Sequence, residues 1–416
     1  MRARRITRVL AAGAIAATTQ CVPCANAVTP PTIDSTRLPA PAPAAPARPT
    51  VQQTVCTVPA RDPGLAATQL DGLNLPELWA LTRGAGQRVA VIDTGVAPHR
   101  RLPGLVGGGD YVASGDGTQD CDGHGTMVAG IIGATTDPAT DRFGGMAPLA
   151  TVIGIRQSST RFGTVGGPPG VGDVETLAKA VRIAADLAAT VINISTVACG
   201  PAHGVDDRAL GAALAYAVEV KGAVVVAAAG NTDDECGTAE PTIVTPAWYD
   251  DYVLTVASVD AQGAPSAFTR PGPWVDVAAP GEAVLSLSTV GDDLATATSA
   301  TSFAAPVVSG LAALIRSRHP QWTARQVMDR IRATAHHPPG GRDDVVGAGV
   351  IDPLAALTFD APRPTPPRPT ARQAPAPVPE PEPEPEPTGL RTAITGIGVL
   401  LAVLLVSITA RARRRG

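Results

Sequence analysis

Short apolar runs alternate with longer helical runs through the middle of this chain, and this alternation restricts the possible folds more than any other feature. The strand-like runs are rich in Val, Ile and Ala and cover 88–96, 151–155, 191–194, 223–226, 252–259 and 274–277. The helical runs among them are 173–188, 207–221 and the stretch that follows Ser302. Strands that are apolar throughout are typical of parallel sheets buried on both faces. The pattern therefore predicts an α/β fold with a doubly wound, mainly parallel sheet and helices on both faces.

Three polar side chains stand where these runs begin or end. Asp93 lies at the carboxyl end of the strand predicted within the run 88–96, and His124 lies between glycines ahead of a small-residue helix. Ser302 opens a long apolar helix, where unpaired N–H groups and the positive end of the dipole would stabilise negative charge. Singly, each has a structural explanation as a turn aspartate, a loop histidine or an N-cap serine. Together they indicate a nucleophile activated by a base and a carboxylate.

The sequences around these residues resemble the subtilisin-like serine proteases, or subtilases. The matching segments are D-T-G at 93–95, H-G-T-M-V-A-G at 124–130 and T-S-F-A-A-P at 301–306, with further matches at 227–231, 279–281 and 347–352. The order Asp, His, Ser along the chain is that of subtilisin. The resemblance runs from about Leu70 to Leu357. The layout of the whole chain resembles the membrane-anchored mycosins of actinobacterial type VII secretion systems.

The resemblance assigns a role to each of these side chains. Ser302 would be the nucleophile, His124 the general base and then acid, and Asp93 the partner that fixes the imidazole tautomer. Asn231 follows the run 223–226 and has a side-chain amide suited to donate to an oxyanion beside the Ser302 N–H. The family assigns Asn231 that role too, whereas its structural alternative is a turn residue after a strand.

The resemblance also indicates where a substrate binds. A peptide would lie as an added strand against Ser195, Thr196 and Val197 and against a second segment after the run 151–155. Such main-chain pairing gives affinity with little sequence preference. Ala228 and Gly230, within 227–230, would line the primary pocket. The Gly- and Pro-rich stretch 156–172 is expected to be a loop that either shapes the cleft or is only an exposed surface loop.

One position departs from the family pattern. Subtilases usually have Gly immediately before the Thr-Ser pair, where this chain has Ala300. If the backbone there needs a positive φ, a methyl group would be strained and activity would fall. Because Asn231 and the three candidate catalytic residues are all present, an active enzyme is still expected.

The N-terminus has the features of an export signal. Residues 1–27 combine a basic start, an apolar stretch at 9–17 and Ala25-Asn26-Ala27, which is typical of a secretory signal peptide. Cleavage after Ala27 would remove two cysteines and leave four in an oxidising compartment: Cys56, Cys121, Cys199 and Cys236.

Four cysteines permit three pairings. Cys199 and Cys236 follow the runs 191–194 and 223–226, and loops that leave the same edge of one parallel sheet can meet. This favours Cys199–Cys236 and leaves Cys56 to pair with Cys121. The mycosin resemblance implies the same two disulfides, and free buried thiols are the alternative.

Residues 28–69 are expected to form an N-terminal extension ahead of a protease domain at 70–359. The extension is Pro- and Ala-rich as far as about Pro49 and should be extended, without a core of its own. Subtilases often carry a folded inhibitory prodomain here, but this segment is too small and too biased for one. The mycosin resemblance implies that it packs along the domain without plugging the cleft.

The C-terminal part of the chain predicts a membrane anchor. Residues 360–389 form a Pro-rich linker with four Pro-Glu repeats, which favours a stiff, solvated stalk. Residues 390–410 are apolar and long enough for one transmembrane helix. Four arginines in the tail 411–416 would place the C-terminus in the cytoplasm. The expected location is thus the cell membrane, single-pass, with the catalytic domain outside.

These features together predict an exported serine endopeptidase, associated with type VII secretion, that processes secreted proteins. Its partners would be peptide or protein substrates, secretion-system membrane components and the membrane itself. A structural subunit that steadies the secretion complex with little or no proteolysis is an alternative, as is a peptide-binding pseudoprotease. The net charge of −4 argues against nucleic acid. No cofactor is expected, and no compact carboxylate loop predicts a metal site.

Overall fold

The computed structural model describes residues 29–62, 68–201, 206–232, 236 and 242–358. The predicted signal peptide at 1–27, the linker at 360–389, the transmembrane helix at 390–410 and the tail at 411–416 lie outside the described residues. Among the residues that are described, no helix has the length and apolar character needed to cross a bilayer.

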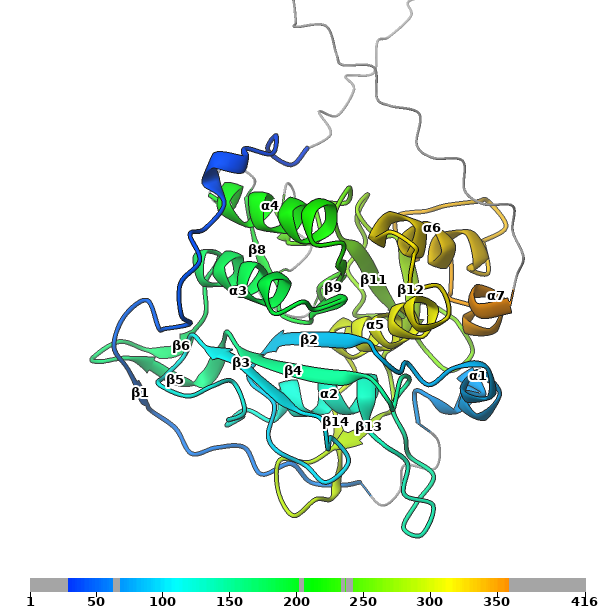
Figure 1. Ribbon diagram of the computed structural model, residues 1–416, viewed down its shortest axis with the longest axis horizontal. Coiled ribbons are helices and arrows are strands. Elements are labelled where there is room, and N and C mark those ends of the chain that lie inside the picture. Colours follow the sequence, from blue (N-terminus) through cyan, green and yellow to red (C-terminus); the bar gives the residue numbers. More distant parts are fainter. Residues whose placement is uncertain (1–28, 63–67, 202–205, 233–235, 237–241, 359–416) are drawn as a thin grey trace, which may run out of the picture. The chain divides into compact units, whose positions relative to one another are not determined.

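A seven-stranded parallel sheet forms the centre of the domain (Figure 1). Its order is β12-β11-β9-β7-β2-β4-β3. The strands are β2 (Arg88–Asp93), β3 (Val106–Asp110), β4 (Thr151–Arg156), β7 (Val191–Ile194), β9 (Val224–Ala228), β11 (Leu254–Val259) and β12 (Val277–Pro280). Almost every residue of the central strands is buried, because both faces of the sheet are covered. The predicted α/β fold with a mainly parallel sheet is confirmed.

Helices cover both faces of this sheet. On one face α2 (His124–Gly133) packs against α5 (Thr301–Arg318), and on the other α3 (Val174–Asp186) packs against α4 (Arg208–Ala215). Figure 1 shows α3 and α4 on the opposite side of the sheet from α2. Three further helices lie around these layers: α1 (Leu75–Leu81), α6 (Ala324–Thr334) and α7 (Pro353–Thr358). The core between the layers consists mainly of Val, Ile, Leu and Ala side chains.

Several predicted boundaries differ from the structure. The helix expected at 207–221 is α4 followed by a π-helical turn, η3 (Tyr216–Val220), and Gly222 ends it with φ +71°. The strand expected at 274–277 is wrong by three residues, because β12 begins at Val277. Asp173 caps α3 as expected, since its carboxylate accepts from Thr176 N at 2.7 Å.

The expectation of a loop over 156–172 is wrong. The chain forms a β-hairpin there, from β5 (Ser159–Thr164) and β6 (Pro169–Val171), with Gly166 in its turn at φ +77°. β5 also pairs with β1 (Thr50–Gln52) of the N-terminal extension to give a three-stranded sheet. Pairing with a segment about 110 residues earlier therefore organises a stretch whose own composition is typical of a loop.

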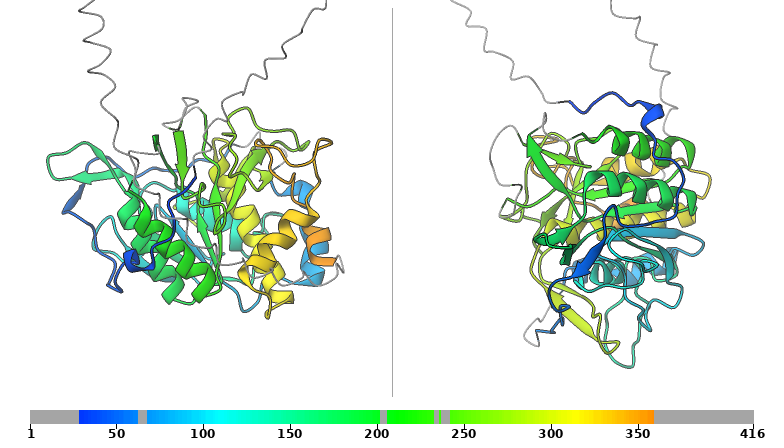
Figure 2. Two further views of the ribbon diagram at one scale, coloured as in Figure 1. Left: turned by 90° about the horizontal axis from the view of Figure 1, so that it is seen from above. Right: turned by 90° about the vertical axis from the view of Figure 1, so that its left-hand side faces the viewer.

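The extension runs along the outside of the domain. Its described part contains only η1 (Ser35–Arg37) and β1, and three partly buried side chains, Ile33, Leu38 and Ala44, pack against the core. The right-hand view of Figure 2 shows it in dark blue, passing the helices before it reaches β1.

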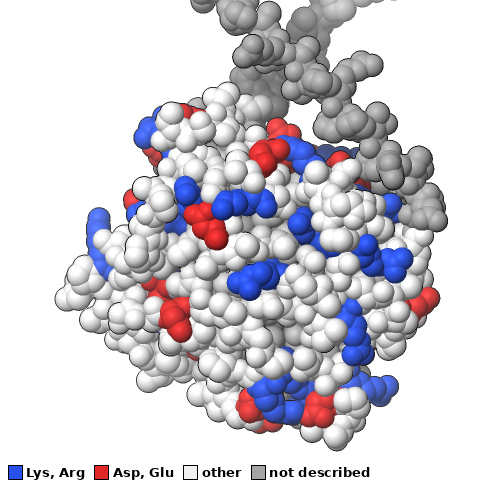
Figure 3. Space-filling model, viewed as in Figure 1, with Lys and Arg blue, Asp and Glu red and all other residues white. Residues whose placement is uncertain are grey.

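On the face drawn in Figure 3, acidic and basic side chains are interspersed and do not form one continuous patch of either sign.

Two antiparallel pairs complete the architecture. β8 (Ala198–Pro201) pairs with β10 (Thr242–Thr245), directly after β7. β13 (Val284–Leu287) pairs with β14 (Leu294–Ala297) ahead of α5. Because all seven strands of the main sheet are parallel, their carboxyl ends share one edge, where open α/β sheets place their ligands. Asp93, Ser195 and Asn231 lie at or just beyond this edge.

Candidate active site

Asp93 is the last residue of β2, and its side chain is fully buried. Oδ1 accepts hydrogen bonds from Thr94 N and from His124 Nδ1, both at 2.7 Å. Oδ2 is buried and has no hydrogen-bond partner among the described residues. The carboxylate is therefore directed toward the imidazole and held against it.

His124 is the first residue of α2 and joins Asp93 to Ser302. Its Nε2 lies 2.9 Å from Ser302 Oγ, and its ring packs on Phe303 with 4.9 Å between centroids. The side chain is 29% exposed, so a ligand can reach it. Gly123 before it has φ +90°, and a Cβ on Gly125 after it would collide with Gly95 O. The glycines on either side of His124 are needed to bring α2 this close to the end of β2.

The charges around His124 favour its protonated form. Burial lowers the pKa of His124, but the negative charge of Asp93 and its hydrogen bond to the ring more than offset this. Asp120 and Asp122 act in the same direction as Asp93. The pKa therefore lies above the ordinary histidine value, as suits a ring that must accept a proton from a serine.

Ser302 is the second residue of α5, and the N-cap Ala300 lies two residues before it. Ala300 has φ −161° and ψ 157°, which is extended backbone that any residue adopts. A positive φ, the condition under which Ala300 would be strained, is therefore not met. The backbone of Ala300 packs closely against Gly281, because a Cβ on Gly281 would come within 2.7 Å of Ala300 O.

Asn231 is oriented by the residue next to the serine. Its Oδ1 accepts from Thr301 N at 3.0 Å and from Thr301 Oγ1 at 2.9 Å. Because Oδ1 accepts two hydrogen bonds from Thr301, the amide is oriented with Nδ2 available to donate to another acceptor. Sequence reasoning selected Asn231 but missed Thr301, although its place between Ala300 and Ser302 in the motif was the available signal.

The expected substrate segment also touches the serine. Ser195 Oγ donates to Ser302 O at 2.8 Å and accepts from Asn193 Nδ2 at 2.9 Å. Asn193 Oδ1 in turn accepts from Ser309 Oγ of α5 at 2.8 Å. This buried chain of neutral hydrogen bonds links the end of β7 to the backbone of Ser302, and the motif-based analysis assigned no role to Asn193 or Ser309.

The other expected pocket residues have unequal access. Val197 is half-buried, and its Cγ2 would lie 3.8 Å from a Cβ built on Gly230. Gly230 has φ +90°, and such a Cβ would also come within 3.2 Å of Cys236 Sγ. Ala228 is 1% exposed within β9, so its side chain belongs to the core. Thr196 is half-buried.

The structure contains the two disulfides that the sequence favoured. Cys56–Cys121 ties the extension to the loop three residues before His124. Cys199–Cys236 joins β8 to the segment that follows Asn231. In the described part of the chain, no group of three or more His, Cys, Asp or Glu side chains is placed to hold a metal ion.

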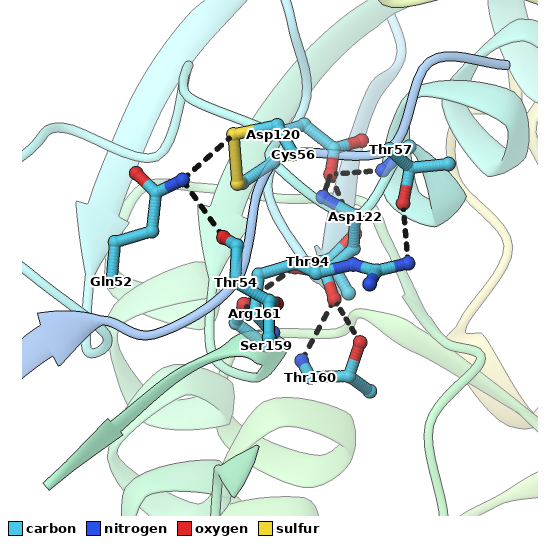
Figure 4. The surroundings of a disulfide bond; sticks show 12 residues. Gln52, Thr54, Cys56, Thr57, Thr94, Asp120, Asp122, Ser159, Thr160 and Arg161 are labelled. Atoms are coloured by element: carbon cyan, nitrogen blue, oxygen red, sulfur yellow. Dashed lines mark hydrogen bonds between the residues drawn. A yellow bond between two sulfur atoms is a disulfide. The ribbon is translucent and has the colours of Figure 1, made fainter. Parts of the chain in front are cut away.

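Figure 4 shows how the loop before His124 is held. Asp122 accepts from Ser159 Oγ at 2.5 Å and from the Thr160 N and Oγ1 atoms at 2.7 and 2.6 Å. Thr57 N donates to Cys121 O at 2.8 Å beside the disulfide. Hydrogen bonds and a covalent bond thus attach this loop to β5 and to the extension.

The arrangement has the parts needed for acyl transfer. A hydroxyl, an imidazole and a buried carboxylate form one continuous hydrogen-bonded chain. An amide donor and the N-terminus of α5 flank the hydroxyl. Such a set can deprotonate a serine as it attacks a carbonyl and stabilise the oxyanion that forms.

Comparison with known proteins places this geometry in context. A model of the subtilase family, Peptidase_S8, matches residues 84–349. Mycosin-4 of Mycobacterium tuberculosis (strain ATCC 25618 / H37Rv) is 58% identical over 388 residues, spanning 87% of this chain and 85% of the relative.

Solved structures agree with the sequence matches. MycP1 from the ESX-1 type VII secretion system has a TM-score of 0.75 at 43% identity, covering 81% of this chain and 98% of that one. A chain of an intact ESX-5 inner membrane complex has a TM-score of 0.75 at 41% identity, covering 92% and 99%.

Proposed function

The chain belongs to the subtilase family of serine endopeptidases and to its mycosins, and from this premise we propose that Asp93, His124 and Ser302 are its catalytic triad. The observation that carries the proposal is the unbroken hydrogen-bonded chain from Asp93 through His124 to Ser302. The distances of 2.7 and 2.9 Å are those of direct hydrogen bonds.

The proposed reaction proceeds by acylation of the serine. Ser302 Oγ attacks the peptide carbonyl while Nε2 of His124 accepts its proton. The buried carboxylate of Asp93 holds the Nδ1–H tautomer and stabilises the imidazolium. His124 then donates the proton to the leaving amine, and water hydrolyses the acyl-enzyme by the same steps in reverse order.

Asn231 is proposed as the side-chain donor of the oxyanion hole. Thr301 holds Oδ1 of Asn231 through two hydrogen bonds, which leaves Nδ2 for the oxyanion. The Ser302 N–H at the start of α5 would be the second donor. Because the donors are in place before the reaction, little reorganisation is needed as charge develops.

The substrate is proposed to be an extended peptide that lies along Ser195, Thr196 and Val197. The ends of β7 and β9 flank Ser302, so the side chain before the scissile bond must enter between them. A methyl group on Gly230 would already contact Val197 Cγ2 at 3.8 Å and Val244 Cγ1 at 3.5 Å. Val197 and Val244 therefore lie beside Gly230.

The location is proposed from the relatives and from the chain ends. Two of the similar structures come from type VII secretion systems, one of them within an inner membrane complex. The proposed organisation is a signal peptide at 1–27, an extension at 28–69, the protease domain at 70–359, a linker at 360–389, a membrane helix at 390–410 and a tail at 411–416. This organisation would hold the protease domain outside the cell membrane. Membrane fractionation of the full chain and of a chain ended at Pro387 tests the anchor.

Replacement of the nucleophile tests the enzymatic proposal. Ser302→Ala should lower kcat for peptide hydrolysis by about 10⁶-fold, as removal of the nucleophile does in subtilisin. Ser317→Ala is the matched control, because Ser317 lies at the opposite end of the same helix, where its hydroxyl accepts from Thr82 Oγ1 and donates to Ala85 O. Equal hydrolysis by the Ser302→Ala and wild-type proteins would contradict the proposal.

A scaffolding role is the second candidate, supported by the similarity to a chain of a membrane complex over 92% of this sequence. It predicts that secretion survives Ser302→Ala but fails when the whole protein is deleted. Secretion lost in both strains would favour the protease.

A further inference from the structure

Asp120 is a carboxylate that the triad chemistry does not use, yet it accepts five hydrogen bonds. Its Oδ1 accepts from Thr94 Oγ1 at 2.9 Å, Gly123 N at 2.7 Å and Asp122 N at 3.1 Å. Its Oδ2 accepts from Thr126 N at 2.9 Å and Thr126 Oγ1 at 2.7 Å. Figure 4 shows Asp120 beside the Cys56 disulfide and close to Thr94.

Thr94 and Thr126 extend this hydrogen-bond network to the segments that contain Asp93 and His124. Thr94 Oγ1 donates to Asp120 and accepts from Gly125 N at 2.9 Å. Thr94 follows Asp93 on the chain, and Gly125 follows His124. Asp120 and Thr94 therefore join the end of β2 to the start of α2 at the two positions next to the acid–base pair.

The second threonine, Thr126, follows Gly125 on α2 and repeats the arrangement. Thr126 Oγ1 donates to Asp120 and accepts from Ala97 N at 2.9 Å. The segment after Asp93 is thus fixed to the first turn of α2 twice, and both links end on one carboxylate. A negative charge is favoured there by the N-terminal end of the helix dipole.

Three carboxylates act electrostatically on His124: Asp93, Asp120 and Asp122. Each raises the pKa of His124. Burial raises the pKa of Asp120 itself, and the hydrogen bonds from Thr126, Gly123 and Thr94 act against that rise. All five of its contacts are donors, which matches an ionised carboxylate and leaves no acceptor for a carboxyl proton.

We propose that Asp120 is a positioning residue for the reaction: it sets the distance and angle between Asp93 and His124. This inference rests on the proposed function, since it concerns the same triad. Asp120 touches neither the substrate nor the reacting atoms. It acts by fixing the backbone on both sides of the Asp93–His124 hydrogen bond, where a displacement of about 1 Å costs roughly 100-fold in rate.

Asp122 offers a matched comparison. It lies two residues before His124 and carries the same charge, but within the described part of the chain its side chain accepts from Ser159 and Thr160 of β5. Loss of either charge should lower the pKa of His124. Of the two carboxylates, Asp120 is the one bonded both to Thr94 after β2 and to Thr126 of α2, so its loss and not that of Asp122 should disturb the geometry.

The experiment compares Asp120→Asn with Asp122→Asn in the full chain, using kcat, KM and the pH profile of kcat/KM. The amide of Asn brings a donor toward groups that are themselves donors, so the network breaks at nearly constant volume. For Asp120→Asn we expect kcat to fall roughly 10- to 100-fold with KM unchanged. The acid limb of kcat/KM should move to lower pH in both variants, because an imidazole with a lower pKa stays neutral down to a lower pH.

Two results would overturn the proposal: wild-type kcat in a folded Asp120→Asn protein, or an equal loss of kcat in both variants. If Asp120→Asn does not fold, Thr94→Val decides, because it keeps the charge and removes only the hydroxyl between Asp120 and Gly125. We expect Thr94→Val to lower kcat without moving the acid limb, and unchanged kcat would overturn the proposal.

A wild-type protein that hydrolyses no peptide would contradict the proposed function and not the positioning role. In that case NMR of histidine-labelled protein decides the positioning role. The Nδ1 proton of His124 in its hydrogen bond to Asp93 should be lost or broadened in Asp120→Asn and kept in Asp122→Asn. Its retention in Asp120→Asn would overturn the proposal.

Discussion

The two halves of the proposed active site are held in place by different kinds of interaction. The acid–base half, Asp93 and His124, is fixed by the carboxylate of Asp120, whereas that of Asp122 ties the preceding loop to β5. A disulfide also ties it to the N-terminal extension. The nucleophile half, Ser302 and Asn231, is fixed by neutral hydrogen bonds and by burial of α5 in the core, where the side chains of Thr301, Ser195, Asn193 and Ser309 form the contacts.

Because of this difference, the two halves should respond to different perturbations. Protonation of a carboxylate or reduction of the Cys56–Cys121 disulfide acts on the acid–base half. The nucleophile half contains no titrating support among the hydrogen bonds just described, so it should respond mainly to changes of packing or of donor geometry. Experiments can therefore address one half at a time.

The largest effect in this comparison is expected on the nucleophile side. Asn231→Ala should lower kcat by about 10²- to 10³-fold with KM little changed, because the donor acts mainly in the transition state. The acid limb of the pH profile should stay in place, since no charge near His124 is lost. Steady-state kinetics from pH 5 to 10 measure both quantities.

Thr301→Val sharpens this test. It removes one of the two hydrogen bonds that orient the Asn231 amide and keeps the backbone N–H bond. The loss of kcat should thus be smaller than in Asn231→Ala and of the same kind. A shift of the acid limb in either variant would show that the two halves are not separable as described.

A smaller effect on rate is expected when the extension is released. In the double variant Cys56→Ala/Cys121→Ala, the disulfide that closes a sequence separation of 65 residues is lost. Stability should fall by about 2–4 kcal/mol, the usual range for a native disulfide. The rate should change only a few-fold, because Asp120 still holds the loop before His124. Thermal unfolding and kcat on the same samples provide the two readouts.

The Cys199–Cys236 disulfide is the matched control, with a separation of 37 residues. Its removal should lower stability by a similar amount but leave the acid limb of kcat/KM in place. If removal of Cys56–Cys121 abolishes activity in a folded protein, the disulfide and not Asp120 holds the acid–base half.

The sequence predicted the parts of the site that depend on chain order. The apolar runs 88–96 and 223–226 identified buried parallel strands, and the motifs around His124 and Ser302 identified helix starts. Together they were sufficient to predict that these residues lie at one edge of the sheet. The favoured disulfide pairs followed from the same edge argument.

Features that depend on distant contacts were not predicted. The hairpin of β5 and β6 forms in a Gly- and Pro-rich stretch because β1 pairs with it from far along the chain. The concern about Ala300 could be resolved only by its observed φ of −161°. The link from Asp120 through Thr94 to Gly125 depends on three segments that meet in space, and no spacing in the sequence encodes it.

The most direct test of the central claim is active-site labelling with a fluorophosphonate, followed by mass mapping of the modified residue. A chain with the hydrogen-bonded triad described above should be labelled at Ser302 with one equivalent, should lose labelling in Ser302→Ala and should keep it in Ser317→Ala. A folded wild-type protein that stays unlabelled, or that is labelled at another serine, would contradict the assignment of Ser302, His124 and Asp93 as one catalytic unit.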